Sequence, residues 1–420
     1  MKKFLSILAA CLLAMTAQAA DVVKVTVQNS LSTVRDGEMV EIPLVQVQKK
    51  LGNATDVIVT DADGREVPSQ VTWDGKLIFQ AYVGAKSKVT YFVKAGQPQH
   101  YRPRVFGRQF PERVDDMAWE NDRVAFRCYG PALQKSGERA WGYDIWNKRT
   151  DHLVVNARYA NELDAEVSSV CNKLRKMGEN DLADDLYNAV SYHVDHGNGM
   201  DCYKVGPTLG AGTAALLSNE GKDIVYPHCY KEFEILDRGP LRFSVKLIYN
   251  EETTEGQTYT ETRVISLDAG SQMNKAVVTY EGLTQPLPLA VGIIVHNENP
   301  TAFVFNEQAG YMGYEDLGDP NQYKPKYREK QNQDFGKIYV GAVYTQKTKG
   351  MEYREGKDLP GACGHILGIT DYKPESQFTY YFGTGWSRNP ATSFQSLTDW
   401  EAYLSRFAQQ VKSPLKVTLK

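Results

Sequence analysis

The feature that most constrains the fold of this chain is an alternation of apolar and polar side chains in short runs. From residue 21 to about 95 these runs are VVKVTVQN, MVEIPLVQV, DVIVTD, LIFQAYV and KVTYFVK. Successive side chains of a strand point to opposite faces, so a period of two predicts strands with one buried face. Turn signals separate the runs, at Asp36-Gly37, Asp63-Gly64 and Asp74-Gly75. Residues 21–98 are therefore predicted to form an Ig-like β-sandwich domain.

Longer runs of the same kind dominate the chain after residue 226. They include FEILDRGPLRFSVKLIYN, LPLAVGIIVHN, KIYVGAVYTQ and QFTYYFGTGWS. The polar stretch AGQPQHYRPR, with two prolines, separates them from the first domain and is typical of a linker. Many strands with little helix between them favour an extended antiparallel sandwich over an α/β enzyme, so residues 99–420 are predicted to form one large β domain.

Only two segments have helical character. Residues 162–188 carry charged and apolar residues at mixed spacing, interrupted near Gly178, and are predicted as one or two short helices or a long loop. From Thr398 to Val411, apolar side chains recur at intervals of four, three and four and form one face. The second segment is therefore predicted as an amphipathic helix.

The N-terminus has the layout of a cleaved secretory signal, here assigned to residues 1–20. Lys2 and Lys3 precede an apolar run, which ends before Ala17-Gln18-Ala19. The sequence before Cys11 resembles a lipoprotein cleavage site, but the apolar region ahead of it is short, which favours export without a lipid anchor. No later apolar segment approaches the roughly 20 residues that a transmembrane helix needs. We expect a periplasmic or secreted protein without a transmembrane segment.

Composition excludes one class of partner and leaves the redox state open. The formal charge is −3, with no basic cluster interleaved with aromatic residues, so nucleic acid is not expected as a partner. Five widely spaced cysteines remain after removal of the signal: Cys128, Cys171, Cys202, Cys229 and Cys363. An odd set of this kind is not a disulfide framework, although it leaves room for one or two bridges.

The densest group of ionisable residues lies between Tyr192 and Gly212, in YHVDHGNGMDCYKVGPTLGAG. Histidine, aspartate, tyrosine and lysine side chains crowd its first half, and five glycines permit unusual backbone angles. Such a density of proton-transfer groups is typical of an active-site loop. The alternative is a purely structural role, in which one histidine is hydrogen-bonded inside the protein and Tyr203 packs in the sheet.

Three stretches carry a resemblance to a known family: the loop just described, the strand LPLAVGIIVHN, and FTYYFGTGWS with the helix and the segment Pro414–Val417 that follow it. Together they resemble a secreted Bacteroidetes family catalogued as a domain of unknown function and found in polysaccharide-utilisation loci. That family is similar to the β-supersandwich group, which includes galactose mutarotase-like domains. The resemblance implies a large antiparallel β-supersandwich and an exported enzyme that acts by β-elimination on uronate-containing oligosaccharides, as dehydratase or lyase.

Elimination from a uronate requires a base for the proton on carbon 5, a cation or amide for the carboxylate, and an acid for the leaving oxygen. The loop supplies candidates for the chemistry: His193, His196, Tyr203 and Lys204. Six further residues are candidates for substrate binding. The aromatic ones could stack on sugar rings, and the amide and the two arginines could bind the carboxylate: Trp141, Tyr143, Trp146, Asn198, Arg242 and Arg263.

Metal binding is a competing use of the histidines. His196, His228 and His296 are candidate ligands of a divalent ion such as Zn²⁺, which would also bind the uronate carboxylate. The chain has no HExxH motif and no paired CxxC motif, so the spacing leaves the question open.

Two other functions remain open at this stage. A glycoside hydrolase would use two carboxylates, drawn from Asp144, Asp195, Asp201, Glu232 and Glu234. The third hypothesis, beside elimination and hydrolysis, is a non-catalytic glycan-binding protein, because sandwich domains often bind sugars without reacting with them. Elimination differs from both, because it produces an unsaturated uronate that absorbs in the ultraviolet.

Overall fold

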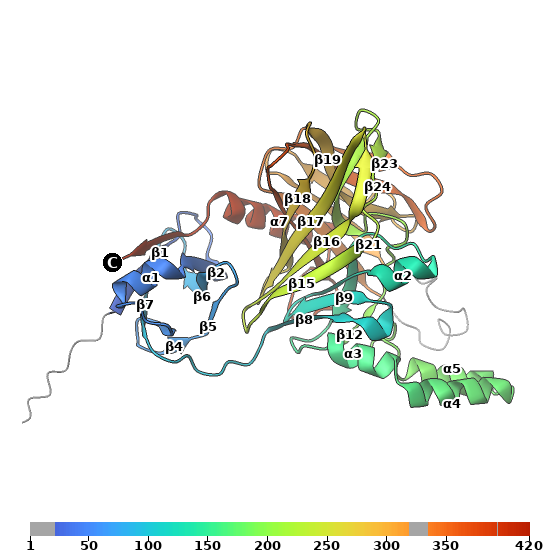
Figure 1. Ribbon diagram of the computed structural model, residues 1–420. Coiled ribbons are helices and arrows are strands. Elements are labelled where there is room, and N and C mark those ends of the chain that lie inside the picture. The colour runs from blue at the N-terminus through green and yellow to red at the C-terminus, as the bar shows by residue number, and fades with distance from the viewer. Residues whose placement is uncertain (1–21, 319–334, 393) are drawn as a thin grey trace, which may run out of the picture.

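The computed structural model describes residues 22–318, 335–392 and 394–420, so the predicted signal peptide lies outside the described residues. The predicted mainly β fold is confirmed: antiparallel sheets make up a small domain and a large one, joined by residues 96–104. Figure 1 shows the small domain beside the large one, with a helical hairpin projecting from the latter. The five cysteines form no disulfide with one another.

The small domain is a sandwich of two sheets around an apolar core. The first sheet has the order β26 (Lys416–Leu419), β1 (Val22–Gln28), β7 (Lys88–Ala95), β3 (Val57–Thr60) and β4 (Glu66–Val67). The second has the order β2 (Arg35–Pro43), β6 (Lys76–Val83) and β5 (Ser69–Val71). In β1, Val23, Val25 and Val27 are buried while the residues between them are not, which is the alternation that the sequence predicts.

One predicted strand is wrong in its second half. The run MVEIPLVQV continues as strand only to Pro43, after which α1 (Leu44–Lys50) begins. Leu44, Val47 and Leu51 follow one another at spacings of three and four, so one helical face packs against the core of the small domain. A proline at this junction cannot donate to the next strand, which ends the ladder there.

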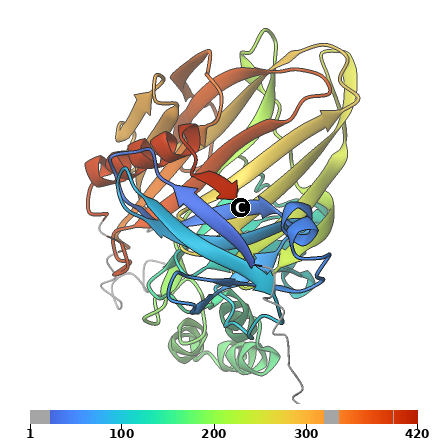
Figure 2. The same cartoon turned by 90° about the vertical axis from the view of Figure 1, so that its left-hand side faces the viewer.

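The last strand of the chain belongs to the first domain. β26 pairs antiparallel with β1, with Val25 opposite Leu419 and Val27 opposite Val417. Figure 2 shows the C-terminal strand lying against the N-terminal sheet. Residues 416–419 thus complete the small sandwich, whereas the sequence assigned everything from residue 99 onward to the large domain.

We expect Val417→Ser with Leu419→Ser to lower the free energy of unfolding by about 1–3 kcal/mol, because both side chains partly bury apolar surface against the small core. The double variant Lys416→Ser with Thr418→Ser is the matched control, since both of those side chains are exposed. Urea unfolding measures the difference, and equal stability of the two double variants would contradict a contribution of β26 to the core.

The large domain is a sandwich of longer strands. Its main sheet has eight strands, in the order β15 (Tyr230–Arg238), β16 (Arg242–Thr254), β17 (Gln257–Asp268), β18 (Met273–Glu281), β25 (Phe378–Trp386), β22 (Lys337–Tyr344), β21 (Tyr311–Leu317) and β20 (Phe303–Asn306). Two five-stranded sheets share one hydrophobic core with it. The first has the order β14 (Asp223–Ile224), β13 (Ala211–Ser218), β19 (Leu287–His296), β24 (Ala362–Tyr372) and β23 (Gly350–Glu355).

The second five-stranded sheet is the one that positions the site described below. Its order is β12 (Gly199–Asp201), β11 (Asp144–Lys148), β10 (Ala125–Cys128), β9 (Asp116–Asn121) and β8 (Val105–Phe110). Ile145, Phe126 and Met117 on one face enter the main core. The opposite face packs against α3 (Val155–Glu162), whose Tyr159 is fully buried.

The predicted helices are present. Residues 162–188 form α4 (Ala165–Lys176) and α5 (Asn180–Asn188), an antiparallel pair separated by Gly178 in a left-handed conformation (φ 86°). The predicted amphipathic helix is confirmed as α7 (Leu397–Lys412), which buries Trp400 and Leu404 and is capped by Ser396. A short helix, α2 (Pro131–Ser136), follows β10. Within the described parts of the chain, no helix combines the length and apolar character needed to cross a membrane.

Candidate active site

A buried arginine, Arg127, lies at the centre of a group of charges on the helix-covered face of the second five-stranded sheet. Antiparallel register places it directly opposite Asp144 of β11. The neighbouring β12 brings in Asp201 next to β11, and β9 contributes Asp116 from the other side. Side chains on one face of adjacent strands are neighbours, so the register of four strands gathers three carboxylates around one guanidinium.

The guanidinium of Arg127 contacts all three carboxylates. Its Nε donates to Oδ2 of Asp144 at 2.8 Å, and its Nη2 donates to the same oxygen and to Oδ2 of Asp201 at 3.0 Å. Its Nη1 lies 3.6 Å from Oδ2 of Asp116. All four residues are buried. Loss of one partner from such a group leaves an uncompensated charge in the interior, which is strongly destabilising.

Three acids beside one arginine shift the proton affinity of the cluster. Burial raises the pKa of Asp144 to about 7, against the lowering effect of Arg127 and with a further increase from Asp201. Burial also raises the pKa of Asp116, although Arg127 and Arg113 oppose the shift. Asp144 therefore exchanges a proton near neutral pH, the range in which a general acid or base operates.

Aromatic side chains surround the charges and satisfy part of their hydrogen-bonding capacity. The hydroxyls of Tyr129 and Tyr159 donate at 2.8 Å to Asp144 and Asp116 respectively. The ring of Trp146 lies 4.7 Å from that of Tyr159 and faces the guanidinium. Burial raises the pKa of both tyrosines well above the usual range, so their hydroxyls remain protonated donors.

His193 and Arg113 lie at the edge of this cluster, where the protein surface begins. Nδ1 of His193 is 3.1 Å from the backbone oxygen of Asp201 and 3.7 Å from its Oδ2, and the side chain is 32% exposed. Arg113 is half-buried, and its Nε donates to the hydroxyl of Tyr192 at 3.4 Å. The ring of Tyr192 lies 4.7 Å from that of His193. The edge therefore presents an imidazole and a guanidinium on either side of one tyrosine.

A strained turn holds Arg113 in place. The 3₁₀ turn η1 (Pro111–Arg113) is followed by Val114 and Asp115, whose φ angles are 44° and 63°. A β-branched residue in this region costs on the order of 1–3 kcal/mol and persists only where its surroundings fix it. Leu133 of α2 donates its N–H to the carbonyl of Val114 at 3.2 Å. Helix α2 thus fixes the turn that presents Arg113.

A second buried polar group supports the far end of the predicted loop. His296 at the end of β19 is 3.0 Å from Asp316 through Nδ1 and 2.9 Å from the backbone oxygen of Lys204 through Nε2. Burial opposes the charge of His296, but Asp316 together with the backbone oxygen of Lys204 outweighs it, so the pKa of the imidazole is raised. The ring of Tyr203 lies 5.6 Å from His296, and its buried hydroxyl has no hydrogen-bond partner among the described residues. This group anchors the loop backbone at residues 203 and 204.

Two glycines allow the end of the loop to pass close to β11. Gly210 adopts φ 53°, and a Cβ at this position would lie 2.3 Å from the backbone oxygen of Tyr143. A Cβ on Gly142 would lie 2.2 Å from the backbone carbon of Leu209. Any other residue at either position would separate the two segments.

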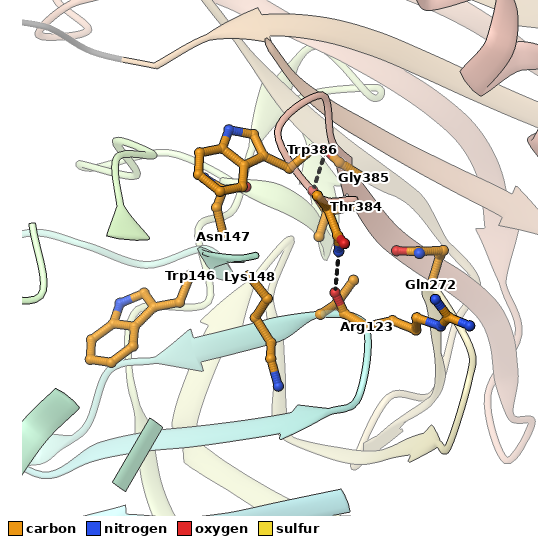
Figure 3. A pocket seen from close by; sticks show the side chains of 10 residues that line it. Arg123, Trp146, Asn147, Lys148, Gln272, Thr384, Gly385 and Trp386 are labelled. Carbon is orange, nitrogen blue, oxygen red and sulfur yellow. Dashed lines mark hydrogen bonds between the residues drawn. The ribbon is translucent and has the colours of Figure 1, made fainter. Parts of the chain in front are cut away.

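A small cavity of about 10 Å³ lies beside the cluster. Figure 3 shows its lining, with Trp146, Asn147 and Lys148 from β11 on one side and Thr384 and Trp386 from β25 on the other. This volume corresponds to about one water molecule and excludes a saccharide ring. The cavity therefore belongs to the packing between sheets.

Comparison with known proteins places the chain in a family. Residues 27–417 match the model of a family described as a domain of unknown function, DUF4861. The chain belongs to the DUF4861 family. The resemblance inferred from the three sequence stretches is thereby confirmed. The DUF4861 chain is also 26% identical over 414 residues to "Uncharacterized protein P7" of the Bacteroidetes bacterium Formosa agariphila, covering 94% of this chain and 93% of that protein.

Similarity to solved structures is weaker. The DUF4861 chain is 10% identical to an α-mannosidase and to a protein of glycosyl hydrolase family 38, both from Enterococcus faecalis, with a TM-score of 0.46 in each case. The matches cover 95% of this chain but 46% and 47% of those proteins. The chain thus spans less than half the length of these solved proteins, and similarity at this level carries no functional argument.

The candidate residues of the 192–212 loop have different surroundings in the structure of the DUF4861 protein. His193 lies beside the Arg127 cluster, whereas the exposed His196 is engaged through Nε2 with the backbone oxygen of Ser191 at 3.0 Å. Asn198 contributes its carbonyl to Arg149 and Arg158 and so shapes the turn. Tyr203 is only 2% exposed, and Lys204 is half-buried.

Most of the predicted saccharide contacts are not placed where a sugar could reach them. Tyr143, Trp146 and Arg263 are each at most 1% exposed. Tyr143 and Arg263 are buried between sheets, where Arg263 is paired with Glu261, and Trp146 is buried beneath α3. Arg242 faces the small domain. The half-buried Trp141 is reachable but lies apart from Trp146, and its ring contacts two other half-buried rings. These contacts are with Tyr226 at 4.8 Å and His228 at 5.1 Å.

The three histidines predicted as metal ligands are not brought together. His196 contacts Ser191, His228 lies 3.4 Å from Glu252, and His296 is held by Asp316. Across residues 22–318, 335–392 and 394–420, no three histidine, cysteine or acidic side chains are arranged to hold a metal ion. The cation of the candidate site is instead the guanidinium of Arg127.

Sequence reasoning missed the residues at the centre of the site: Arg113, Asp116, Arg127, Tyr129 and Tyr159. A signal was present, because Arg127 is the one charged residue in the apolar strand VAFRCY. A charge in such a strand requires a buried partner. The partners themselves depend on strand register, which the sequence does not reveal.

We expect Asp144→Asn to remove part of the pH dependence of folding. The folded protein holds the Asp144 proton with a pKa of about 7, against an ordinary value of 3.8, so the stability contributed by this proton falls as the pH rises above about 4 and is lost above about 7. Urea unfolding at about pH 5 and about pH 7 measures the effect. The wild type should lose more stability than the variant between these two conditions, and an equal loss would contradict the raised pKa.

Proposed function

We propose that this DUF4861 protein is an exported carbohydrate-active enzyme that acts by β-elimination on uronate-containing oligosaccharides. The observation that carries the proposal is the position of His193 and Arg113 at the edge of the Arg127 cluster. A basic nitrogen, a cation for a carboxylate and a protonated tyrosine then lie within one connected group. Export rests on the signal-like sequence of residues 1–20.

His193 is assigned as the base. When its Nδ1–H donates to the backbone oxygen of Asp201, the lone pair of the neutral imidazole is on Nε2. The nearby Asp201 carboxylate stabilises the imidazolium that forms when Nε2 accepts a proton. This is the arrangement in which a carboxylate orients a catalytic histidine.

Arg113 is assigned to the substrate carboxylate. A planar guanidinium pairs with a carboxylate through two parallel hydrogen bonds, and the half-buried position of Arg113 strengthens this pairing. Neutralising the carboxylate lowers the cost of the negative charge that develops when carbon 5 loses its proton.

Tyr129 is assigned as the acid, in place of the more deeply buried Tyr203. Its hydroxyl stays protonated, donates to Asp144 and lies 3.4 Å from Nη2 of Arg127. Nη2 also contacts Asp201, which holds His193. One guanidinium nitrogen therefore connects the acid with the base, and Asp144 can return a proton to Tyr129 because its pKa is about 7.

The proposed reaction is balanced within the substrate. His193 removes the proton from carbon 5, the electron pair of that bond forms the double bond between carbons 4 and 5, and the bond from carbon 4 to oxygen breaks. The leaving oxygen takes a proton from Tyr129 and departs as water or as a sugar hydroxyl. Hydrolysis fits less well, because the carboxylates of Asp144 and Asp201 are both paired with Arg127.

We expect His193→Ala to lower kcat by roughly 10²–10⁴-fold, the usual contribution of a general base. The assay follows ultraviolet absorbance of the unsaturated product from galacturonan, alginate and glycosaminoglycan oligosaccharides. His100→Ala in the exposed linker is the matched control and should retain wild-type turnover. New reducing ends without the chromophore would indicate hydrolysis, and binding without turnover would indicate a glycan-binding protein.

Arg113 should act mainly on substrates that carry a carboxylate. We expect Arg113→Gln to lower kcat/KM by about 10–100-fold, the loss of one charge-assisted pair, while Arg113→Lys retains part of the activity. Steady-state kinetics on an oligouronate, before and after methyl esterification, provides the measurement. The esterified substrate should be equally poor for all three proteins. Unchanged kinetics of Arg113→Gln on the free acid would contradict the assignment of Arg113 to the substrate carboxylate.

A further inference from the structure

We infer that the groove between the two domains is a second saccharide-binding site, separate from the reaction centre. The groove has a volume of about 870 Å³ and is lined by the small domain, by strands of the main sheet and by α7. Figures 1 and 2 show α7 and the C-terminal strand running beside the junction of the two domains. This volume lies in the range of sites that enclose small organic ligands. The inference rests on the proposed function only for the class of ligand.

The two walls of the groove are held at a fixed distance by interdomain hydrogen bonds. The Gln70 side chain accepts from the N–H groups of Leu241 and Arg242 at 3.0 and 2.8 Å, and it donates to the Arg242 carbonyl at 3.1 Å. The Gln80 side chain donates to the carbonyl of Ala269 at 2.8 Å. Arg242 also pairs with Glu41 across the junction at 2.7 Å. Such contacts preform the groove, which reduces the entropic cost of binding.

Aromatic rings line the α7 side of the groove. Tyr381 of β25 and Phe407 of α7 meet edge to face at 5.1 Å, and Tyr403 stacks near Phe407 at 6.1 Å. All three side chains are half-buried, so each has one part in the core and another at the groove. Apolar ring faces of this kind pack against the C–H groups of a pyranose.

Polar side chains with unused or surface-directed groups complete the lining. Gln272 is 5% exposed, and its Oε1 has no hydrogen-bond partner among the described residues. This oxygen is closed off from solvent, so the polar recognition of a sugar falls to the charged side chains of the lining. Lys275 and Arg406 add positive charge to the lining, and Asp36 and Glu38 add acceptors. Aromatic faces with both donors and acceptors suit an oligosaccharide better than an apolar ligand or a simple anion.

The groove also lies next to the sheet that carries the reaction centre. Arg123 and Gln272 line both the groove and the small cavity in Figure 3, whose other wall includes Trp146. Trp146 in turn faces the Arg127 guanidinium. A glycan bound in the groove would therefore be retained within the same molecule, close to the site that processes it, which raises its effective concentration there.

The test uses the full mature chain and calorimetric titration with hexasaccharides of galacturonan and alginate, on a His193→Ala background so that turnover is slow. Ala391→Trp fills the groove from an exposed loop position, and Ala402→Trp on the exposed side of α7 is the matched control. Tyr381→Ala removes one aromatic face without filling the space. We expect Ala391→Trp and Tyr381→Ala to weaken binding of one hexasaccharide at least tenfold, while Ala402→Trp binds like its parent.

The outcomes separate this inference from the proposed reaction. In the otherwise wild-type chain, Ala391→Trp should leave turnover of a disaccharide unchanged. Weakened binding by the groove variants would support the groove even if no eliminating activity is found. Unchanged affinity in both groove variants, or no binding of either hexasaccharide by the parent, would overturn the inference and leave the groove as a solvent-filled gap between domains.

Discussion

The interior of the large domain depends on the neutralisation of buried carboxylates by Arg127. Asp116, Asp144 and Asp201 come from three different strands, and the guanidinium between them compensates the charge that these strands bury. The energetic cost of desolvating four charged groups is high, so an apolar replacement would serve stability alone equally well or better. Charged side chains at this point therefore favour the proposed chemical role, and the histidine and arginine at the edge of the cluster have the exposure that such a role needs.

The small and the large domain also depend on each other. The small sandwich obtains one strand from the end of the chain, and it contacts the large sheet through the side chains of Gln70, Gln80 and Arg242. These contacts fix the width of the groove and, through the shared residues Arg123 and Gln272, connect it with the interior near β11. The small domain is therefore part of a ligand-facing surface as well as a separate fold.

The sequence was informative wherever a local period decides the structure. Alternation predicted the strands, and the apolar stripe that includes Trp400 and Leu404 predicted α7. The sequence pattern was misleading at Pro43, where a strand-like run becomes helix. The last strand could not be assigned to the first domain, because pairing over almost the whole chain has no local signal.

Of the predicted site, the loop does contain His193 and Asp201. The aromatic residues Tyr143 and Trp146 proved to be interior, since aromatic side chains occur in cores and sugar sites alike. Arg127 and its partners were missed because strand register brings them together.

The pairing of β26 with β1 has a consequence for how the protein is made. β1 is made before the strands of the large domain, whereas its neighbour Lys416–Leu419 follows all of them in the chain. Until then β1 has an open edge on that side, and an open edge is a template for association with other chains. The first sheet of the small domain can therefore be completed only after the chain that forms the large domain has been made.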